Sequence, residues 1–326
     1  MRAVVLVGGE GTRLRPLTLT TPKQMLPVGG QPMIERVLGR LAAHGVDEAV
    51  LSLGYRPDAF MDAYPDGRCA GVALRYAVED EPLDTAGAIR FAALEAGLAE
   101  TFVVVNGDVI TDLDVTELVR FHRDRRAEAT ISLTPVPDPS RFGVVATDGA
   151  GRVVAFIEKP PPGQAPTNLI NAGTYVLEPS VIDRIPGGRR VSIERETFPA
   201  LVREGRLFAL PSTAAWLDAG TPATYLEANL RYATDPDRSC RLGEGAVAKE
   251  SVLGAGVTLG AQVLVNRSVV MDGAVIGEGS EVSGSIVGSG AVIGAGSTVL
   301  SLSVIGQGIE VAAGTRLRSQ RVPAAP

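Results

Sequence analysis

The sequence has few of the residues on which disulfide, metal-cluster or histidine chemistry depends. Its two cysteines, Cys69 and Cys240, are too far apart for a metal-ligand or redox spacing and form no disulfide framework. We therefore expect two free thiols in a reducing compartment. The two histidines, His44 and His122, fall in segments expected to be helical and away from every motif described below. We interpret both as structural.

Long apolar runs and an excess of positive charge are also absent. No segment approaches the roughly 20 apolar residues of a membrane span. The apolar run at 3–7 is too short for a secretory signal, and no small-residue cleavage site follows it. A formal charge of −6 argues against a nucleic-acid binder, which needs a basic face. We expect a cytoplasmic protein that recognises phosphate through a few cations and backbone N–H groups.

The first 235 residues alternate between strand and helix signals. Strands are expected at 3–7, 49–53, 101–105 and 129–136, a hairpin at 142–147 and 153–158, and helices at 32–43, 86–96, 115–126 and 222–232. Such alternation predicts an α/β domain with a mainly parallel sheet and helices on both faces. The composition changes near Asp235-Pro236, so we predict one domain over 1–235 and a second over 236–326.

The second predicted domain is rich in Gly, Val and Ser and has a period near six. One aliphatic residue recurs in each hexad and glycine often follows it, as in Leu253-Gly254, Leu259-Gly260 and Ile293-Gly294. The pattern predicts a left-handed parallel β-helix of about four coils, with the aliphatic side chains inside. A low-complexity Gly/Val linker is the alternative. We expect the β-helix to support a homo-oligomer, because it contains no histidine for acyl transfer and its open ends need covering.

A glycine-rich stretch after the first expected strand is the strongest functional signal. It reads Gly8-Gly9-Glu10-Gly11-Thr12-Arg13, and its backbone N–H groups can form a concavity that binds anions. The glycine spacing matches neither a Walker A loop nor a dinucleotide fingerprint. Arg13 can fork onto phosphate oxygens, and Lys23 can add a point charge. Together they predict a triphosphate site, with a strand-to-helix turn carrying surface cations as the alternative.

Two aspartates are candidate ligands of one Mg²⁺ ion. Asp108 ends the run Asn106-Gly107-Asp108 directly after an expected strand, and Asp218 lies in Trp216-Leu217-Asp218-Ala219-Gly220. Ligands of open α/β sheets bind beyond the carboxyl ends of strands, and carboxylates there suit Mg²⁺. An aspartate after a strand is also commonly a turn residue or a helix cap, and that alternative stays open.

Polar residues at and beyond the end of the hairpin are candidates for binding an acceptor phosphate and its sugar. Lys159 can neutralise a phosphate, and Glu158 can accept hydrogen bonds from sugar hydroxyls. Asn171 and Gly173 offer an amide and a close backbone approach. Each could instead belong to a turn, so their joint presence carries the prediction.

These motifs together resemble the nucleotide-sugar pyrophosphorylase family over essentially the whole chain. Within the family the resemblance is strongest to enzymes that transfer a guanylyl group to mannose 1-phosphate and carry an appended β-helix. The matching segments are Gly8 to Thr18, Pro22-Lys23, Glu81-Pro82, Thr85-Ala86-Gly87, Asn106-Gly107-Asp108, Phe142-Gly143-Val144, Glu158-Lys159-Pro160, Ile170-Asn171-Ala172-Gly173 and Ser192 to Pro199.

The resemblance implies a Rossmann-like nucleotidyltransferase domain that uses Mg²⁺, a nucleoside triphosphate (GTP favoured) and a sugar 1-phosphate. It makes Arg13, Lys23, Asp108 and Asp218 catalytic, the two aspartates being the metal ligands. The nucleotide-binding residues that it implies are Leu6, Gly8, Gly9, Gly11, Thr12, Arg13, Lys23, Glu79, Pro82, Asp84, Thr85, Ala86 and Gly107. Those for the sugar phosphate are Gly143, Glu158, Lys159, Asn171 and Gly173.

By the same resemblance, residues 79–87 read the nucleoside base. Guanine presents two donors on its pairing edge, and a carboxylate from Glu79 or Glu81 can accept both; a solvated acidic turn is the alternative for each. Two residues depart from the pattern. Asp84 stands where many relatives have Gly, and Gln24 stands where guanylyltransferases often carry Pro and thymidylyltransferases often carry Gln. Thymidylyl, uridylyl or adenylyl transfer to glucose 1-phosphate, a cyclitol phosphate substrate and a non-catalytic regulatory homologue therefore stay open.

Overall fold

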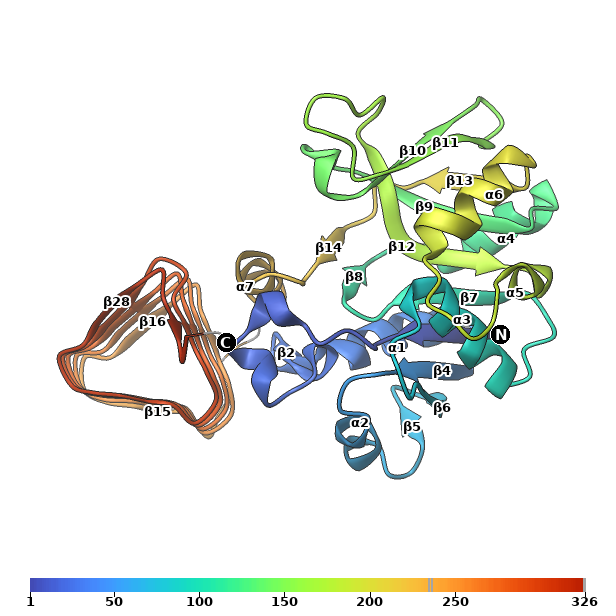
Figure 1. Cartoon of the computed structure of the whole chain (residues 1–326). Coiled ribbons are helices and arrows are strands. Elements are labelled where there is room, and N and C mark those ends of the chain that lie inside the picture. Colours follow the sequence, from blue (N-terminus) through green and yellow to red (C-terminus); the bar gives the residue numbers. More distant parts are fainter. Residues whose placement is uncertain (234, 236, 325–326) are drawn as a thin grey trace. The chain divides into compact units, whose positions relative to one another are not determined.

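The computed structural model describes residues 1–233, 235 and 237–324 of the chain, which form two compact units (Figure 1). Unit 1 comprises Met1–Gly9 and Ile34–Trp216, and unit 2 comprises Glu10–Met33 and Leu217–Pro326. The glycine-rich loop is therefore divided, with Gly8 and Gly9 in unit 1 and its remainder in unit 2. The predicted boundary between 235 and 236 touches Pro236, which lies outside the described residues, and it stays a prediction.

Unit 1 is built on a twisted, mixed β-sheet. Its strands are β1 (Arg2–Leu6), β4 (Glu48–Leu53), β5 (Arg68–Cys69), β6 (Val72–Val78), β7 (Phe102–Asn106), β9 (Ala129–Pro135), β10 (Gly143–Thr147), β11 (Val153–Glu158), β12 (Leu169–Leu177) and β13 (Leu207–Pro211), while β8 (Val109–Thr111) and β14 (Trp216–Asp218) lie outside this sheet. The order along the main path is β11-β10-β12-β7-β1-β4-β6-β5. The central strands β7, β1, β4 and β6 are parallel, and the predicted hairpin is β10 paired with β11. The parallel centre places the carboxyl ends of β1, β4, β6 and β7 at one edge.

Unit 1 also contains helices, which alternate with the strands along the chain. They are α1 (Met33–Ala43), α2 (Asp58–Ala63), α3 (Asp84–Glu95), α4 (Val115–Arg125), α5 (Ser180–Arg184) and α6 (Phe198–Arg203). Helix α3 contacts β1, β4 and β6, and α4 contacts β9, β12 and β13. Helix α4 begins at a side-chain cap, because Asp114 accepts a hydrogen bond from the Glu117 N–H at 2.9 Å. The expected strands and helices of this region are confirmed to within about two residues, as usual for element ends.

The two histidines and the two cysteines serve no common site. His122 is buried, with Nδ1 2.9 Å from Thr130 Oγ1 and Nε2 3.0 Å from Glu178 Oε1. Burial lowers the pKa of His122, partly offset by its hydrogen bond with Glu178. Cys69 and Cys240 are free, as expected. Among the described residues, no helix has both the length and the hydropathy to cross a bilayer.

Unit 2 joins an N-terminal segment to helix α7 (Pro222–Arg231) and a parallel β-helix. The segment at 10–33 contains short 3-10 turns at Thr12–Leu14, Leu17–Leu19 and Lys23–Met25, then strands β2 (Pro27–Val28) and β3 (Gln31–Pro32). Helix α7 starts at a capping box formed by Thr221 and Thr224. Its Tyr225 hydroxyl donates to the Pro27 carbonyl, and Asn229 Oδ1 accepts from Gly29 N–H at 3.0 Å.

Three parallel sheets form the β-helix (Figure 1). The first contains β15 (Arg241–Leu242), β18 (Thr258–Leu259), β21 (Val275–Ile276), β24 (Val292–Ile293) and β27 (Glu310–Val311). The second contains β16 (Val247–Lys249), β19 (Leu264–Asn266), β22 (Glu281–Ser283), β25 (Thr298–Leu300) and β28 (Arg316–Arg318), and the third β17 (Val252–Leu253), β20 (Val269–Val270), β23 (Ile286–Val287), β26 (Val304–Ile305) and β29 (Arg321–Val322). Each sheet takes one strand from every coil, so the described residues form five coils, one more than predicted.

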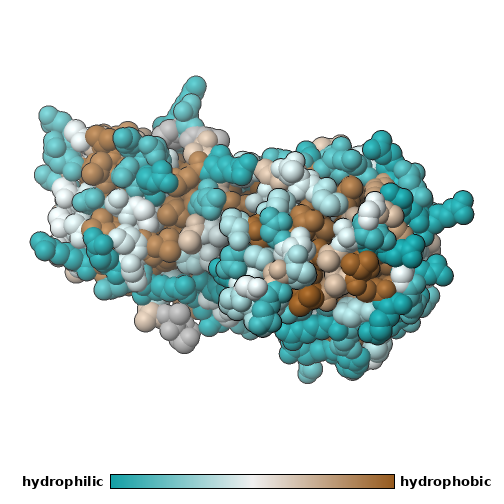
Figure 2. Space-filling view, turned by 90° about the horizontal axis from the view of Figure 1, so that it is seen from above, coloured by the Kyte–Doolittle hydropathy of each residue, from teal (hydrophilic) through white to brown (hydrophobic). Residues whose placement is uncertain are grey.

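The β-helix coil is shorter than three full hexads. Leu259 pairs with Ile276, which is 17 positions further along, and Ile276 pairs with Ile293 after the same interval. One hexad in each such coil therefore lacks a residue, which explains why the period of the aliphatic repeat is near six but not constant. At the shortened corner, Ser268 Oγ accepts from the Ser285 N–H at 3.1 Å, so a serine compensates for the missing residue. On the visible face of the β-helix, hydrophobic residues are interspersed with hydrophilic ones (Figure 2).

Candidate active site

Four predicted nucleotide-binding residues of unit 1 meet at the carboxyl edge of its parallel strands. The Gly107 N–H donates to the Leu6 carbonyl at 2.9 Å, which joins the ends of β7 and β1. A methyl group added at Gly8 would lie 3.6 Å from Glu79 Oε1 and 3.5 Å from Gly54 N. The start of the glycine-rich loop therefore lies directly beside the Glu79 carboxylate, although 70 residues separate them in the sequence.

Glu79 is held in one orientation. Its side chain is buried, Oε1 accepts from the Ser52 hydroxyl at 2.8 Å, and Oε2 accepts from the Leu83 N–H at 2.9 Å. Each carboxylate oxygen has two lone pairs, so both can accept a further donor. Glu81 and Pro82 are exposed. Of the two candidate base readers, Glu79 is therefore the one that is fixed beside the loop.

The segment that follows Glu79 is tied to a distant stretch of chain. Asp84 has φ +62°, the left-handed conformation that favours glycine, and its Oδ1 accepts from the Thr85 N–H at 2.8 Å. The Thr85 hydroxyl donates to Glu194 Oε2 at 2.8 Å and accepts from the Ile193 N–H at 2.8 Å. The Ala86 N–H also bonds to this stretch. The departure at Asp84 therefore sits at a backbone position suited to the glycine of many relatives.

Two of the predicted motifs converge where β12 is irregular. Gly173 has φ +75°, and a methyl group there would lie 2.6 Å from Asn106 Nδ2. Asn171 Oδ1 accepts from the Gly173 N–H at 3.1 Å, and its Nδ2 donates to the Tyr175 hydroxyl at 3.0 Å. The close approach explains why this position needs glycine. It also brings the predicted sugar-binding turn against the run that contains Asp108.

Tyr175 is a buried residue of β12 that contacts the predicted site through Asn171, and it was not expected from the sequence. Burial raises its pKa, and the nearby carboxylates of Glu194, Glu158 and Asp108 raise it further. Three acidic groups from distant segments therefore act electrostatically on one hydroxyl. A tyrosine within the aliphatic strand Leu169–Leu177 was the available signal. Glu194 was also missed, although the matching motif at 192–199 contains it.

Glu158 and Lys159 end strand β11 beside Gly143. Gly143 pairs opposite Glu158, and a methyl group there would lie 3.0 Å from Glu158 Oε2 and 2.8 Å from Phe156 Cζ, so it also requires glycine. The Lys159 ammonium lies 3.4 Å from Glu158 Oε1 and its side chain is 59 % exposed. Such an exposed pair contributes little to stability, which leaves the ammonium available to a phosphate.

Unit 2 carries the remaining predicted catalytic groups. A methyl group added at Gly220 would lie 2.7 Å from both Arg13 Nη2 and Asp218 Oδ1, so these two groups flank one glycine. The Gly220 N–H donates to Asp218 Oδ1 at 2.9 Å. Gly11 has φ +63°, and a methyl group there would lie 3.1 Å from Lys23 Cβ. Glycine at both positions therefore allows Arg13 and Lys23 to pack closely within the unit.

The donors available for a metal are carboxylates alone. The described residues contain no group of three or more His, Cys, Asp or Glu side chains that could hold an ion. Asp108 in unit 1 and Asp218 in unit 2 are both half-buried; Asp108 lies just after β7, and Asp218 is the last residue of β14. Mg²⁺ commonly takes one or two carboxylates and completes its shell with water and substrate phosphates, and this donor set fits it. The Mg²⁺ site stays a prediction.

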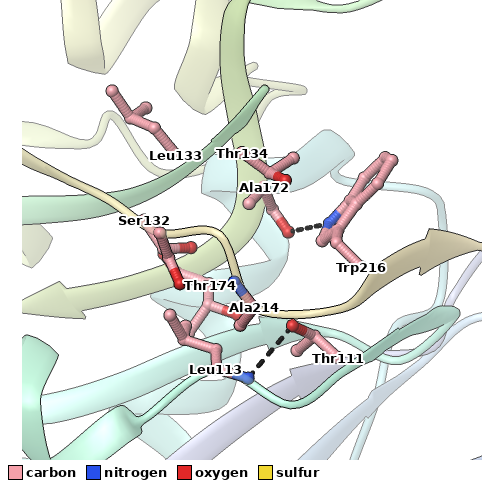
Figure 3. A pocket seen from close by; sticks show the side chains of 10 residues that line it. Thr111, Leu113, Ser132, Leu133, Thr134, Ala172, Thr174, Ala214 and Trp216 are labelled. Atoms are coloured by element: carbon pink, nitrogen blue, oxygen red, sulfur yellow. Dashed lines mark hydrogen bonds between the residues drawn. The ribbon is translucent and has the colours of Figure 1, made fainter. Parts of the chain in front are cut away.

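A cavity beside the turn predicted to bind the sugar is too small for a substrate (Figure 3). Its volume is about 10 Å³, room for about one water molecule. The Trp216 indole N–H donates to the Ala172 carbonyl at 2.9 Å across it, and the Leu113 N–H donates to Thr111 Oγ1 at 3.2 Å (Figure 3). The cavity is lined by Thr111, Leu113, Ser132, Leu133, Thr134, Ala172, Thr174, Ser212, Ala214 and Trp216. These contacts hold the main chain at Ala172, next to Asn171 and Gly173.

The fold and these residues define a protein that handles nucleotide phosphates, and the chain belongs to the nucleotidyl transferase family. The family model matches residues 2–235, and a model of the GMPPB C-terminal domain matches 235–325. A mannose-1-phosphate guanylyltransferase of Mycobacterium tuberculosis is 46% identical over 226 residues, covering 69% of this chain and 62% of that protein. A mannose-1-phosphate guanyltransferase of Aspergillus oryzae is 42% identical over 238 residues, 72% of this chain and 65% of its own. The chain thus matches somewhat less than two thirds of the length of these relatives.

Solved structures give a consistent likeness. HddC from Yersinia pseudotuberculosis, also solved with GMP-PN, is 31% identical with a TM-score of 0.62 and covers 71% of this chain and 99% of its own. A structure from Bacillus anthracis described as a glucose-1-phosphate thymidylyltransferase, with bound sucrose, is 26% identical with a TM-score of 0.65. That match covers 71% of this chain and 95% of the other.

Proposed function

We propose that the chain transfers a guanylyl group from GTP to mannose 1-phosphate, forming GDP-mannose and pyrophosphate. The observation that carries this proposal is the convergence of Gly8, Glu79, Asp108, Glu158 and Asn171 in unit 1. Relatives named as mannose-1-phosphate guanylyltransferases support the choice of substrates. The nucleotide, the sugar and the roles of the residues all belong to the proposal.

The proposed reaction is an in-line displacement at the α-phosphorus of GTP. A phosphate oxygen of mannose 1-phosphate forms the new bond to this phosphorus. The bond from the α-phosphorus to the oxygen that bridges it to the β-phosphorus breaks, and pyrophosphate leaves with the electron pair. The attacking oxygen is already ionised near neutral pH, so the protein needs no strong general base. Catalysis then rests on positioning the reactants and neutralising their charge.

Different charged side chains neutralise different phosphates. Arg13 and Lys23 bind triphosphate oxygens, and the backbone N–H groups of the glycine-rich loop add neutral donors. Lys159 binds the phosphate of the sugar, which counters the repulsion between two anionic reactants. Mg²⁺ held by Asp108 and Asp218 would supply charge neutralisation at the reacting phosphates.

Specificity rests on groups with fixed orientation. Glu79 accepts the two donors on the pairing edge of guanine, because Ser52 and Leu83 already hold its carboxylate in place. Glu158 and Asn171 bind sugar hydroxyls, and Gly143 and Gly173 leave room for the ring. The Tyr175 hydroxyl orients the Asn171 amide.

Two wider expectations remain part of the proposal. The enzyme acts in the cytoplasm and binds neither nucleic acid nor membrane, as its charge and composition predict. It forms a homo-oligomer through the β-helix, whose first two sheets expose Leu242, Val247, Leu264 and Val275.

The test is a matrix of five nucleoside triphosphates against several sugar 1-phosphates, with Mg²⁺ and pyrophosphate release as the readout. We expect the highest kcat/KM for GTP with mannose 1-phosphate. Preference for dTTP with glucose 1-phosphate would favour the second candidate, which Gln24 and the likeness to the Bacillus anthracis structure suggest. Preference for a cyclitol phosphate would overturn only the assignment of mannose 1-phosphate as the acceptor. If no pair of substrates is turned over, the proposed activity is wrong and the alternative of a non-catalytic regulatory homologue is favoured.

A further inference from the structure

The segment that carries the cationic triphosphate ligands is part of the same compact unit as the β-helix. Residues Glu10–Met33 group with Leu217–Pro326 and not with the sheet of unit 1. Arg13 and Lys23 both lie in this segment. Their positions therefore depend on contacts made within unit 2. Such a dependence would give the β-helix a part in nucleotide binding beyond support of an oligomer.

One corner of the β-helix contacts the segment through a specific polar group. Gln307 Oε1 accepts a hydrogen bond from the Thr20 hydroxyl at 2.7 Å and lies 3.4 Å from the Thr21 hydroxyl. At the preceding residue, a methyl group added to Gly306 would lie 3.3 Å from Pro16 Cβ. The turn at 306–307 therefore approaches the segment in two places, with glycine allowing the close approach and glutamine supplying the acceptor.

Apolar packing between the same two parts is incomplete. A pocket of about 250 Å³ that is open to solvent lies between them. Leu17, Thr21 and Met25 line it from the segment, and Met271, Ser289 and Gln307 from the β-helix. Because this pocket is open to solvent, the segment makes fewer apolar contacts with the β-helix here than a core element makes with its neighbours. Discrete hydrogen bonds then have a larger share in fixing its position.

The two threonines lie directly before the residues that bind phosphate. Pro22 and Lys23 follow them, and the Leu26 N–H donates to the Lys23 carbonyl at 3.1 Å to close the next turn. The Lys23 side chain is buried against Gly11, whose added methyl group would lie 2.9 Å from Thr18 Cγ2. A displacement at Thr20 and Thr21 would therefore move the start of the turn that carries Lys23 and, through Gly11, the glycine-rich loop.

We propose that Gln307 is a positioning residue: by accepting the Thr20 and Thr21 hydroxyls, it holds the triphosphate-binding segment of residues 10–33 in its binding conformation. The proposal rests on the proposed use of a nucleoside triphosphate. Gln307 touches no reacting atom in this role. Its loss weakens the binding of the triphosphate in the ground state and the transition state alike, because the whole loop becomes less ordered.

The test compares three variants with a matched control. Gln307→Met removes the acceptor and keeps the length of the side chain, whereas Gln307→Glu keeps an acceptor at the same place. Thr20→Val removes the stronger donor. Gln320→Met makes the same chemical change at another exposed β-helix glutamine. For each variant, kcat and KM are measured for both substrates, and hydrogen–deuterium exchange is followed over residues 10–25 without nucleotide.

We expect Gln307→Met to raise the KM for GTP about fivefold, the effect of losing one hydrogen bond, with kcat within about twofold. The KM for mannose 1-phosphate should stay unchanged. Exchange at residues 10–25 should become faster in Gln307→Met and Thr20→Val, and the double variant should add little. Gln307→Glu and Gln320→Met should behave as the wild type.

Failure of this inference and failure of the proposed function give different results. An unchanged KM for GTP and unchanged exchange in Gln307→Met, in an active wild-type enzyme, would overturn the positioning role. An equal rise of KM in Gln320→Met would also overturn it, because the effect would then be general to the β-helix. A wild type inactive with every triphosphate would overturn the proposed function, while the exchange data would still decide whether Gln307 orders the segment.

Discussion

The two compact units hold their functional residues in different ways. In unit 1 the side chains stand at the ends of paired strands and are locked by buried contacts, as Glu79 is by Ser52 and Leu83. In unit 2 Arg13 and Lys23 lie on a succession of short 3-10 turns. A pocket of about 250 Å³ that is open to solvent lies between this segment and the β-helix.

The difference indicates how rigidly each unit holds its own candidate functional residues. Strand ends in a continuous sheet are fixed by many main-chain hydrogen bonds, so a single side-chain change disturbs them little unless it collides with the backbone. A segment of short turns depends on fewer contacts and moves when one is lost. We therefore expect the side chains of unit 1 that are proposed to bind the base and the sugar to be preorganised. We expect Arg13 and Lys23 of unit 2, which are proposed to bind the triphosphate, to be adjustable.

The largest effect should come from Asp108, the proposed metal ligand of unit 1. Asp108→Asn keeps the shape of the side chain and removes its charge, and we expect kcat/KM to fall about a thousandfold, because charge neutralisation at the reacting phosphates is lost. Steady-state pyrophosphate release measures it. Asp124→Asn on the exposed face of α4 is the matched control. An Asp108→Asn enzyme with more than a tenth of the wild-type rate would refute the metal role.

Two glycine substitutions compare the rigidity of the units directly. Gly173→Ala meets Asn106 at 2.6 Å with φ +75°, and we expect a loss of about 3 kcal/mol in the free energy of unfolding. Gly11→Ala meets a side-chain methyl group of Thr18 at 2.9 Å, and we expect about 1–2 kcal/mol, since the adjustable segment can give way.

Denaturant unfolding and steady-state kinetics measure this pair. Gly11→Ala should mainly raise the KM for GTP, whereas Gly173→Ala should reduce the yield of folded protein. Equal losses of stability, or a greater loss in Gly11→Ala, would contradict the difference in rigidity.

The preference of the enzyme for one nucleoside base should depend on Glu79. Glu79→Gln replaces an acceptor pair with one acceptor and one donor, so we expect the preference for GTP over dTTP, as a ratio of kcat/KM values, to fall about tenfold or more. Glu81→Gln at the neighbouring exposed position is the control. An unchanged preference in Glu79→Gln would remove Glu79 as the base reader and leave its hydrogen bonds with Ser52 and Leu83 as its only role.

The smallest effect is a dependence of stability on pH. We expect it in unit 1, because unit 1 contains both histidines. Burial lowers the pKa of His122 below its ordinary 6.5, and burial also lowers that of His44. As the pH falls below 6.5, the unfolded chain takes up a proton before the folded chain does, so stability is lost, by up to about 1.4 kcal/mol per pH unit for each histidine.

Calorimetry between pH 7 and pH 5.5 measures this dependence. The transition of unit 1 should shift to lower temperature as the pH falls, and His122→Gln should make the shift shallower. An equal shift in the transition of unit 2, which has no histidine, would show that the histidines are not its cause.

Periodic segments could be predicted from the sequence, and contacts between distant segments could not. The strand at Arg2–Leu6 and the β-helix have local hydrophobic patterns that determine them. The grouping of Glu10–Met33 with the β-helix depends on contacts such as Thr20 with Gln307, nearly 290 positions apart, which no local pattern shows. The predicted count of coils was one too low because the aliphatic repeat was followed only to about residue 317, whereas the last strand, β29, ends at Val322.

The candidate site shows the same limit. Gly8, Asp108, Glu158 and Asn171 were predicted because each lies in a short motif with its own chemistry. Tyr175 and Glu194 were not, because their position beside these groups follows only from the pairing of β12 and the contact of Thr85 with Glu194.

The most direct measurement is phosphorus NMR of the wild-type enzyme with GTP, mannose 1-phosphate and Mg²⁺. The account predicts that the mannose 1-phosphate signal is replaced by the two coupled signals of GDP-mannose, with one equivalent of pyrophosphate for each GTP consumed. Release of inorganic phosphate, or loss of GTP without loss of mannose 1-phosphate, would contradict the account. In either case GTP would be cleaved without forming a bond between its α-phosphorus and the sugar phosphate.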